Sequence, residues 1–162
     1  MLVISDTSAL SALAETGLLH ILPALVNCVS ITESVRCECL NAGAPDALRL
    51  WIGRPPDWLA VAPDPRTLLD ETSALGAGEA TAITLAWQHR NSSQLILDER
   101  RGRKVARNLG LKMTGVLALV TDAAIAGLVD FEDAIQRLKA VNFRISDVLI
   151  EEARMSISKS MT

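Results

Sequence analysis

The sequence predicts an α/β fold with three layers, α/β/α, around a mainly parallel central sheet. Short apolar runs that suit buried strands alternate with longer helical segments along the whole chain. A helix-capping residue directly follows several of these runs, and a strand that passes into a helix is the unit that links neighbouring parallel strands. The length of 162 residues is that of one domain.

The expected elements follow from this alternation and from the positions of glycine and proline. Strands are expected at residues 2–5, 29–31, 59–62, 95–97 and 112–114. Helices are expected at residues 9–14, 18–26, 33–40, 45–52, 79–90, 99–109, 116–126 and 130–141, and in a last segment capped by Ser146. Residues 1–155 are expected to form a single domain, and residues 156–162 a frayed C-terminal tail.

The composition excludes several classes of protein. With 49% hydrophobic and 22% charged residues, the chain is too apolar for a disordered protein. Acidic residues interrupt every apolar run before the roughly 18 residues that a membrane span needs, so no membrane association is expected. The net charge of −3 excludes a protein that holds nucleic acid by overall charge alone. The N-terminus has no basic segment and an acid at position 6, so a cytoplasmic protein without a signal peptide is expected.

The three cysteines are expected to be reduced thiols, because an odd number in a chain without an export signal does not suit a disulfide framework. The spacing Cys37-x-Cys39 leaves a zinc site as an alternative. A structural zinc site needs four ligands, however, and the only histidines, His20 and His89, each lie alone in apolar surroundings of the sequence. Buried or half-buried thiols are therefore the expectation.

Two acids follow expected strands directly. Asp6 comes after the first strand and Asp98 after the strand at 95–97. The carboxyl ends of parallel strands meet at one edge of the sheet, where α/β proteins place their functional crevice. The alternative is that both acids only cap the helices that follow. For Asp6 this is the weaker explanation, because Thr7 and Ser8 could cap that helix equally well.

Glu38 and Glu79 are expected at the same edge. Glu38 lies in a helix that begins just after a strand, and Glu79 opens a helix behind two glycines that permit close backbone approach. Each acid alone also fits a solvated position. Four carboxylates in one crevice cannot all be ionised without a compensating cation. The sequence therefore indicates a hard divalent cation, Mg²⁺ or Mn²⁺, which takes oxygen ligands and bridges to phosphate.

A basic segment follows Asp98 immediately. It contains five cationic residues, Arg100, Arg101, Arg103, Lys104 and Arg107. Helical spacing places Arg100, Lys104 and Arg107 on one face, brings Arg103 partly onto it and directs Arg101 elsewhere. This face either holds RNA phosphates beside the acids or is simply solvated. Base stacking has few candidates, since 3% of the residues are aromatic, and the three tryptophans suit a core or an interface better.

Four motifs in order resemble the PIN-domain nucleases. They are Asp6-Thr7-Ser8-Ala9-Leu10 after the first strand, Glu38 in the following region, Gly-Ala-Gly-Glu-Ala at 76–80 and Leu-Ile-Leu-Asp-Glu-Arg-Arg at 95–101. The resemblance covers residues 1–150 and is closest to a prokaryotic PIN-like branch that also shows the Gly110-Leu111-Lys112-x-Thr114-Gly115 step. Two positions depart from the related VapC-type toxins. The third acid is Glu79 where the toxins usually carry Asp, and Glu99-Arg100 replaces an acid followed by an aromatic residue.

The resemblance implies a metal-dependent endoribonuclease that uses Mg²⁺ or Mn²⁺. The acidic cluster of the family falls on Asp6, Glu38, Glu79 and Asp98, as catalytic and metal-binding residues, with Ser8 as a supporting polar group. A similar protein in a type II toxin–antitoxin pair has RNA as its substrate and a small antitoxin protein as its partner. The resemblance also implies a homodimer.

Two other functions remain open. A PIN-like interaction module without catalytic activity would keep the fold and lose the metal. A phosphatase of the haloacid dehalogenase type also places an Asp after its first strand, to form an aspartyl-phosphate. That chemistry needs a second Asp two residues later, and this position is Ser8.

Overall fold

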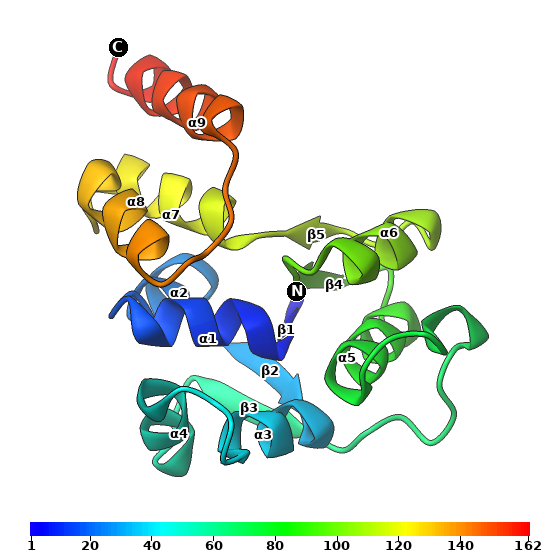
Figure 1. Ribbon diagram of the computed structural model, residues 1–162. Helices are drawn as coiled ribbons and strands as arrows, with labels where there is room; N and C mark the ends of the chain where they lie inside the picture. Colours follow the sequence, from blue (N-terminus) through cyan, green and yellow to red (C-terminus); the bar gives the residue numbers. More distant parts are fainter.

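Five parallel strands form one central sheet in the computed structural model, which describes residues 1–162 (Figure 1). The strands are β1 (Leu2–Ser5), β2 (Val29–Thr32), β3 (Leu59–Ala62), β4 (Ser93–Ile96) and β5 (Met113–Thr114). Their order in the sheet is β3-β2-β1-β4-β5, so β1 is central and every pairing is parallel. The chain adds β2 and β3 on one side of β1 and then β4 and β5 on the other. The strand order therefore reverses between β1 and β4, which makes their carboxyl ends the switch point of the sheet.

Nine helices surround this sheet and confirm the expected three-layer α/β/α fold. They are α1 (Thr7–Glu15), α2 (Ile21–Val26), α3 (Glu33–Leu40), α4 (Asp46–Gly53), α5 (Ala77–Gln88), α6 (Arg100–Asn108), α7 (Val116–Ile125), α8 (Phe131–Ala140) and α9 (Asp147–Ser160), with a short 3-10 turn η1 at Asp70–Thr72. Figure 1 shows α7, α8 and α9 together at one side of the molecule, with α9 farthest from the sheet. None of these helices has the length and apolar character needed to span a membrane.

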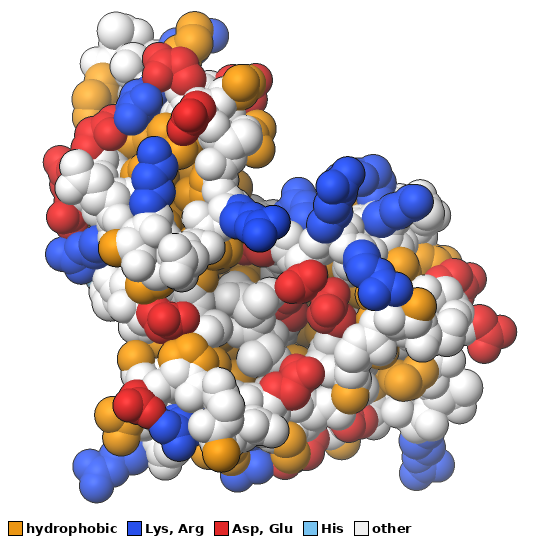
Figure 2. Space-filling model, in the orientation of Figure 1, with side chains coloured by type: hydrophobic (Ala, Val, Ile, Leu, Met, Phe, Trp, Pro, Cys, Tyr) orange, Lys and Arg blue, Asp and Glu red, His pale blue; other side chains and the backbone are white.

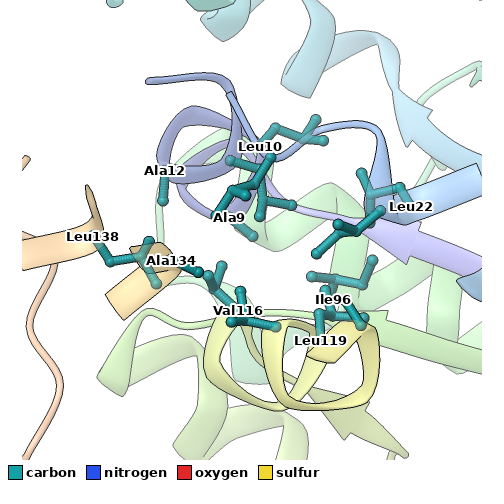
Figure 3. Packing of buried hydrophobic residues seen from close by; sticks show 14 of the residues in the cluster. Ala9, Leu10, Ala12, Leu22, Ile96, Val116, Leu119, Ala134 and Leu138 are labelled. Carbon is teal, nitrogen blue, oxygen red and sulfur yellow. The ribbon is translucent and has the colours of Figure 1, made fainter. Parts of the chain in front are cut away.

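Alternate residues of the strands enter two separate cores. Val3 and Ile96 belong to a cluster of 27 buried residues, which packs α1, α2, α7 and α8 against one face of the sheet (Figure 3). Ile4 and Leu95 belong to a smaller cluster of 9 buried residues under α5 and α6. Burial on both faces explains why residues 2–4 and 95–97, in and beside the two central strands, are unbroken apolar runs in the sequence.

Local signals set the ends of several helices as the sequence predicts. Thr32, Asp130 and Ser146 each accept a backbone N–H bond with their side chain at the start of a helix. Gly110 and Gly127 adopt positive φ angles of 72° and 75° just after α6 and α7. Only glycine adopts this conformation without a steric penalty, so these residues end the helices.

Some boundaries differ from the sequence-based expectations. Helix α9 runs through Ser160, and so includes most of the segment expected to fray from residue 156. The reason is tertiary packing, because the half-buried side chain of Ile157 packs against the large core cluster. All three cysteines are free, as expected, but Cys28 and Cys37 are exposed and only Cys39 is buried.

The larger core gives a prediction about stability. Leu13 on α1 is completely buried, whereas Leu50 on α4 is 77% exposed. We expect Leu13→Ala to lower the free energy of unfolding by about 2–5 kcal/mol, because it removes buried methyl groups and leaves a cavity. The matched substitution Leu50→Ala should change it by less than about 0.5 kcal/mol. Urea unfolding followed by circular dichroism measures both, and equal losses would contradict this placement of the core.

Candidate active site

The switch point of the sheet carries the two acids expected there. Asp6 directly follows β1, and its backbone N–H donates to the carbonyl oxygen of Ile96 on β4 at 3.2 Å. Asp98 lies two residues after the end of β4. The register pairs Ser5 with Ile96, so the two chains leave the sheet at the same edge. This edge is where the sequence places the functional crevice.

A small hollow of about 280 Å³ opens at this edge, and every residue that lines it is polar. Its lining is Asp6, Thr7, Ser8, Ser11, Glu38, Glu79 and Glu99. Asp98 lines a neighbouring hollow, which shares Ser8 and Glu99 with the first. Figure 2 shows acidic side chains gathered in the middle of this face, with Lys and Arg side chains along the border formed by α6. The structure therefore brings the four predicted acids to adjoining hollows and adds a fifth, Glu99.

Asp6 is buried and held in place by two bonds. Its side chain is 1% exposed and accepts hydrogen bonds from the Ser8 hydroxyl at 2.7 Å and from the Ala9 backbone N–H at 3.0 Å. Asp6 is thus the N-cap of α1, in place of Thr7 or Ser8, and also lines the hollow. The pKa of its carboxyl is raised to about 7, chiefly because burial disfavours the charged form. The nearby charges of Asp98 and Glu79 act in the same direction.

Glu38 is held across the hollow by groups from two other helices. It accepts a hydrogen bond from the Thr7 hydroxyl at 2.6 Å and another from the Gly78 backbone N–H at 3.2 Å. A Cβ atom on Gly78 would collide with the Glu38 carboxyl group. The glycines before Glu79 are therefore not there for Glu79 alone, as the sequence predicts, because the space at Gly78 is occupied by Glu38.

Glu79 has the least satisfied carboxyl group of the site. Its Oε2 atom is buried and has no hydrogen-bond partner, and it lies where a Cβ atom on Gly102 would be. The pKa of Glu79 is raised by burial, followed by the charges of Glu99 and Glu38. The charge of Arg101 lowers it. A buried carboxylate oxygen without a donor is unfavourable, so this atom lacks a positively charged or proton-donating partner.

Asp98 connects the site to α7. Its Oδ2 accepts a bond from the backbone N–H of Val116 at 2.9 Å, so its side chain caps α7 and not the helix that follows it in sequence. A Cβ atom on Gly115 would lie 2.5 Å from the other carboxylate oxygen. Burial raises the pKa of Asp98, while the bond from Val116 and the charge of Arg103 lower it.

The cationic residues of α6 are arranged differently from the expectation. Arg103 is half-buried and donates to the carbonyl oxygen of Leu97 at 2.6 Å, so it supports the strand end beside Asp98. Arg101, which helical spacing directs elsewhere, lies close enough to Glu79 to lower its pKa. Arg100 lines the second hollow. Lys104 and Arg107 are exposed and form no ion pair.

The donor chemistry of the site suits a hard cation. All its charged donors are carboxylate oxygens, the ligands that Mg²⁺ and Mn²⁺ prefer. The nearby Cys39 is not a thiolate, because burial, followed by the charges of Glu38 and Asp6, raises its pKa to about 12. As the side chains lie, no three Asp, Glu, His or Cys groups are close enough together to hold a metal ion. The carboxyls of Asp6, Glu38 and Asp98 instead accept hydrogen bonds from groups of the protein itself.

Comparison with known proteins identifies the family. Residues 2–159 match the DUF3368 family, which is described as a PIN domain. The chain belongs to the PIN-domain family. This match covers almost the whole chain and confirms the resemblance seen in the sequence. The PIN domain is a nuclease fold, and PIN nucleases generally use divalent metals. No curated protein matches the sequence.

The buried acid of this PIN domain gives a prediction about pH. The unfolded chain loses the Asp6 proton near pH 4 and the folded chain near pH 7, so the folded state alone holds this proton between those values. We therefore expect the free energy of unfolding of the metal-free protein to fall as pH rises from 4 to 7, with a contribution from Asp6 on the order of 1.4 kcal/mol per pH unit. Glu79 and Asp98, whose pKa values are also raised, act in the same direction.

Urea unfolding in EDTA at several pH values measures this effect. Asp6→Asn should flatten the pH dependence, because the amide does not titrate. The exposed acid in Asp57→Asn serves as the control and should leave the slope unchanged. A wild-type slope that the Asp6 variant retains would contradict the burial cost assigned to this carboxyl.

Proposed function

We propose that this protein is a metal-dependent endoribonuclease in which Asp6, Glu38, Glu79 and Asp98 form the catalytic and metal-binding site. One observation carries this proposal. The Oε2 atom of Glu79 is buried without a partner, in a polar hollow that also holds Asp6, Glu38 and Glu99. The charges of Glu99 and Glu38 raise the pKa of Glu79 further, after burial, and a bound cation would remove that cost. The membership of the PIN-domain family agrees with this interpretation.

The residues present fit a hard divalent cation, Mg²⁺ or Mn²⁺. The oxygens of Asp6 each accept one bond from the protein and keep a second lone pair, while Glu79 keeps an oxygen with no bond at all. Asp98 has one oxygen that does not bond to Val116. Ser8 supports the site by fixing the orientation of Asp6. Glu38 would have to give up the hydrogen bond from the Thr7 hydroxyl in order to become a ligand of the same cation.

A bound divalent cation supplies a Lewis acid for the phosphodiester and lowers the pKa of water for attack on it. The chain itself supplies position and charge. Asp6 and Asp98 are fixed by the ends of two paired strands, and Arg103 secures the strand end through the Leu97 carbonyl. Arg100, Lys104 and Arg107 provide free cationic groups on α6 for the RNA phosphates. These local contacts are needed because a protein with a net charge of −3 does not attract RNA through its overall charge.

The role of the protein in the cell is proposed from the resemblance to VapC-type toxins. We infer that it is the toxin of a type II toxin–antitoxin pair, that it forms a homodimer and that a small antitoxin protein inhibits it. The alternative of an inactive interaction module would retain the fold but show no cleavage. A phosphatase of the haloacid dehalogenase type is not supported, because Ser8 stands where a second acid is needed and the chain belongs to the PIN-domain family.

The nuclease proposal predicts a clear effect of Asp6→Asn. We expect the wild type to cleave single-stranded RNA in Mn²⁺ and not in EDTA, and the variant to lose at least about a hundredfold in rate, as expected when an electrostatic contact to the reacting charge is removed. Gel analysis of a labelled RNA measures the rate. Asp57→Asn removes an exposed acid outside the site and should retain full activity.

The same pair of variants separates the alternatives. Growth arrest on induction of the wild type, but not of Asp6→Asn, supports the toxin role, and its relief by a neighbouring reading frame identifies the antitoxin. RNA cleavage without growth arrest would retain the nuclease and reject the toxin. Folded wild type that neither binds Mn²⁺ nor cleaves RNA would favour the inactive module.

Gly102→Ala should have opposite effects on stability and on metal binding. Alanine in a helix is about 1 kcal/mol more favourable than glycine, so the free energy of unfolding should stay equal or rise. The new Cβ would occupy the place of Glu79 Oε2 and displace that carboxyl. We therefore expect weaker Mn²⁺ binding by titration calorimetry, by about tenfold. Gly53→Ala, where a Cβ meets no neighbour, is the control. Unchanged Mn²⁺ affinity in Gly102→Ala would contradict a role for Glu79 as a ligand.

A further inference from the structure

A second and larger hollow adjoins the acidic one. Its volume is about 650 Å³, and it is lined by Ser8, Asp98, Glu99, Arg100, Asn142, Phe143 and Arg144. Pockets that bind small ligands have volumes of roughly 300–1,000 Å³, so this hollow is large enough for a nucleotide. Because Ser8 and Glu99 line both hollows, the two form one continuous depression. In Figure 2 cationic side chains border the acidic centre on the side of α6.

Two guanidinium groups at this hollow have no partner in the protein. Arg100 lies at the start of α6, and Arg144 in the connection between α8 and α9. Neither arginine forms a salt bridge or a side-chain hydrogen bond. The arginines that do form ion pairs, Arg36, Arg49, Arg137 and Arg154, each pair with an Asp or Glu three or four residues away on the same helix. Two unpaired arginines that face one hollow from different elements are suited to a phosphate, which accepts bidentate hydrogen bonds.

The connection that carries Arg144 has a fixed conformation. Asn142 adopts a positive φ of 61°, and the N–H groups of Asn142 and Phe143 donate to the carbonyls of Lys139 and Leu138 at 3.0 Å each. These two bonds form a Schellman motif, which ends α8. Phe143 is half-buried and packs against the large core cluster while it also lines the hollow. The hollow therefore has a rigid wall with one aromatic ring, one amide and one guanidinium.

We propose that this hollow binds the nucleotide next to the cleaved phosphodiester, with Arg100 and Arg144 on its phosphate and its base against Phe143. The inference rests on the proposed ribonuclease function and assigns the Asn142–Arg144 connection to the recognition of substrate. An aromatic face binds any base, whereas the Asn142 amide offers both a donor and an acceptor to a base edge. Phe143 and the two arginines thus supply affinity, and Asn142 supplies preference among bases.

Binding of RNA in EDTA tests this assignment without cleavage. The probes are fluorescein-labelled single-stranded RNAs of about ten nucleotides, of poly(A), poly(U) and poly(C) sequence, followed by fluorescence anisotropy. Arg144→Gln should raise the Kd about tenfold for all three and reduce the salt dependence by a slope of about 0.7. Arg54→Gln removes an exposed arginine outside the hollow and should change the Kd less than twofold.

Asn142→Gly separates recognition from folding. Glycine keeps the positive φ angle of the turn and removes the amide. We expect the affinities of the three probes to converge while the melting temperature stays equal or rises. Phe143→Leu, which keeps the apolar packing, should weaken all three probes about fivefold or more.

Each outcome supports or overturns the assignment. A wild type that binds the probes in EDTA, with Arg144→Gln equal to wild type, would overturn it and leave the nuclease proposal intact. Probe binding that depends on Arg144, in a protein that never cleaves RNA in Mn²⁺, would support the hollow as a nucleotide site and overturn the nuclease. Absence of probe binding to the folded wild type would overturn the assignment. A loss of affinity in Arg54→Gln as large as that in Arg144→Gln would overturn it too.

Discussion

The buried carboxyl of Asp6 is the constraint around which the rest of the site is organised. It lies at the end of the central strand, where burial and neighbouring acids both disfavour its charge. The protein offsets this cost with a hydroxyl from Ser8 and the open N–H of Ala9. The same N–H belongs to the first turn of α1, so the helix that follows the strand supplies the group that stabilises the acid. An aliphatic residue at this position would deprive both the helix and the hollow of their polar partner.

The positions of Glu38 and Glu79 depend on glycines, which leave space for their carboxyl groups, as well as on hydrogen-bond donors. The carboxyls of Glu38 and Glu79 occupy the volumes that Cβ atoms of Gly78 and Gly102 would fill. These two glycines lie in helices, where glycine is less favourable than alanine. The molecule therefore accepts weaker helices in order to bring carboxyl groups from α3 and α5 against the backbone of α5 and α6. This pattern is typical of a site that is selected for function over stability.

Local sequence patterns predict part of the acidic site. The positions of Asp6 and Asp98 follow from apolar runs that end in an acid, and parallel strands make such ends neighbours. The role of Gly102 and the proximity of Arg101 to Glu79 could not be predicted, because they depend on how α5 and α6 pack together. The Asn142–Arg144 connection was missed for the same reason, since its residues are far from the acids in sequence and meet them only through the fold. Residues 156–160 are helical because Ile157 packs on the core, which their polar composition conceals.

The Asp98 carboxyl takes part both in the lining of the hollow and in the start of a helix. It lines the hollow beside the acids, and it also holds the first N–H of α7, the helix on which α9 packs. A ligand that turns this carboxyl must change the hydrogen bond at the start of α7, and a shift of α7 must change the carboxyl. A ligand that binds through this carboxyl and weakens its bond to Val116 would thereby disfavour the start of α7, and by linkage a loss of order at α7 would change the affinity for that ligand by the same factor.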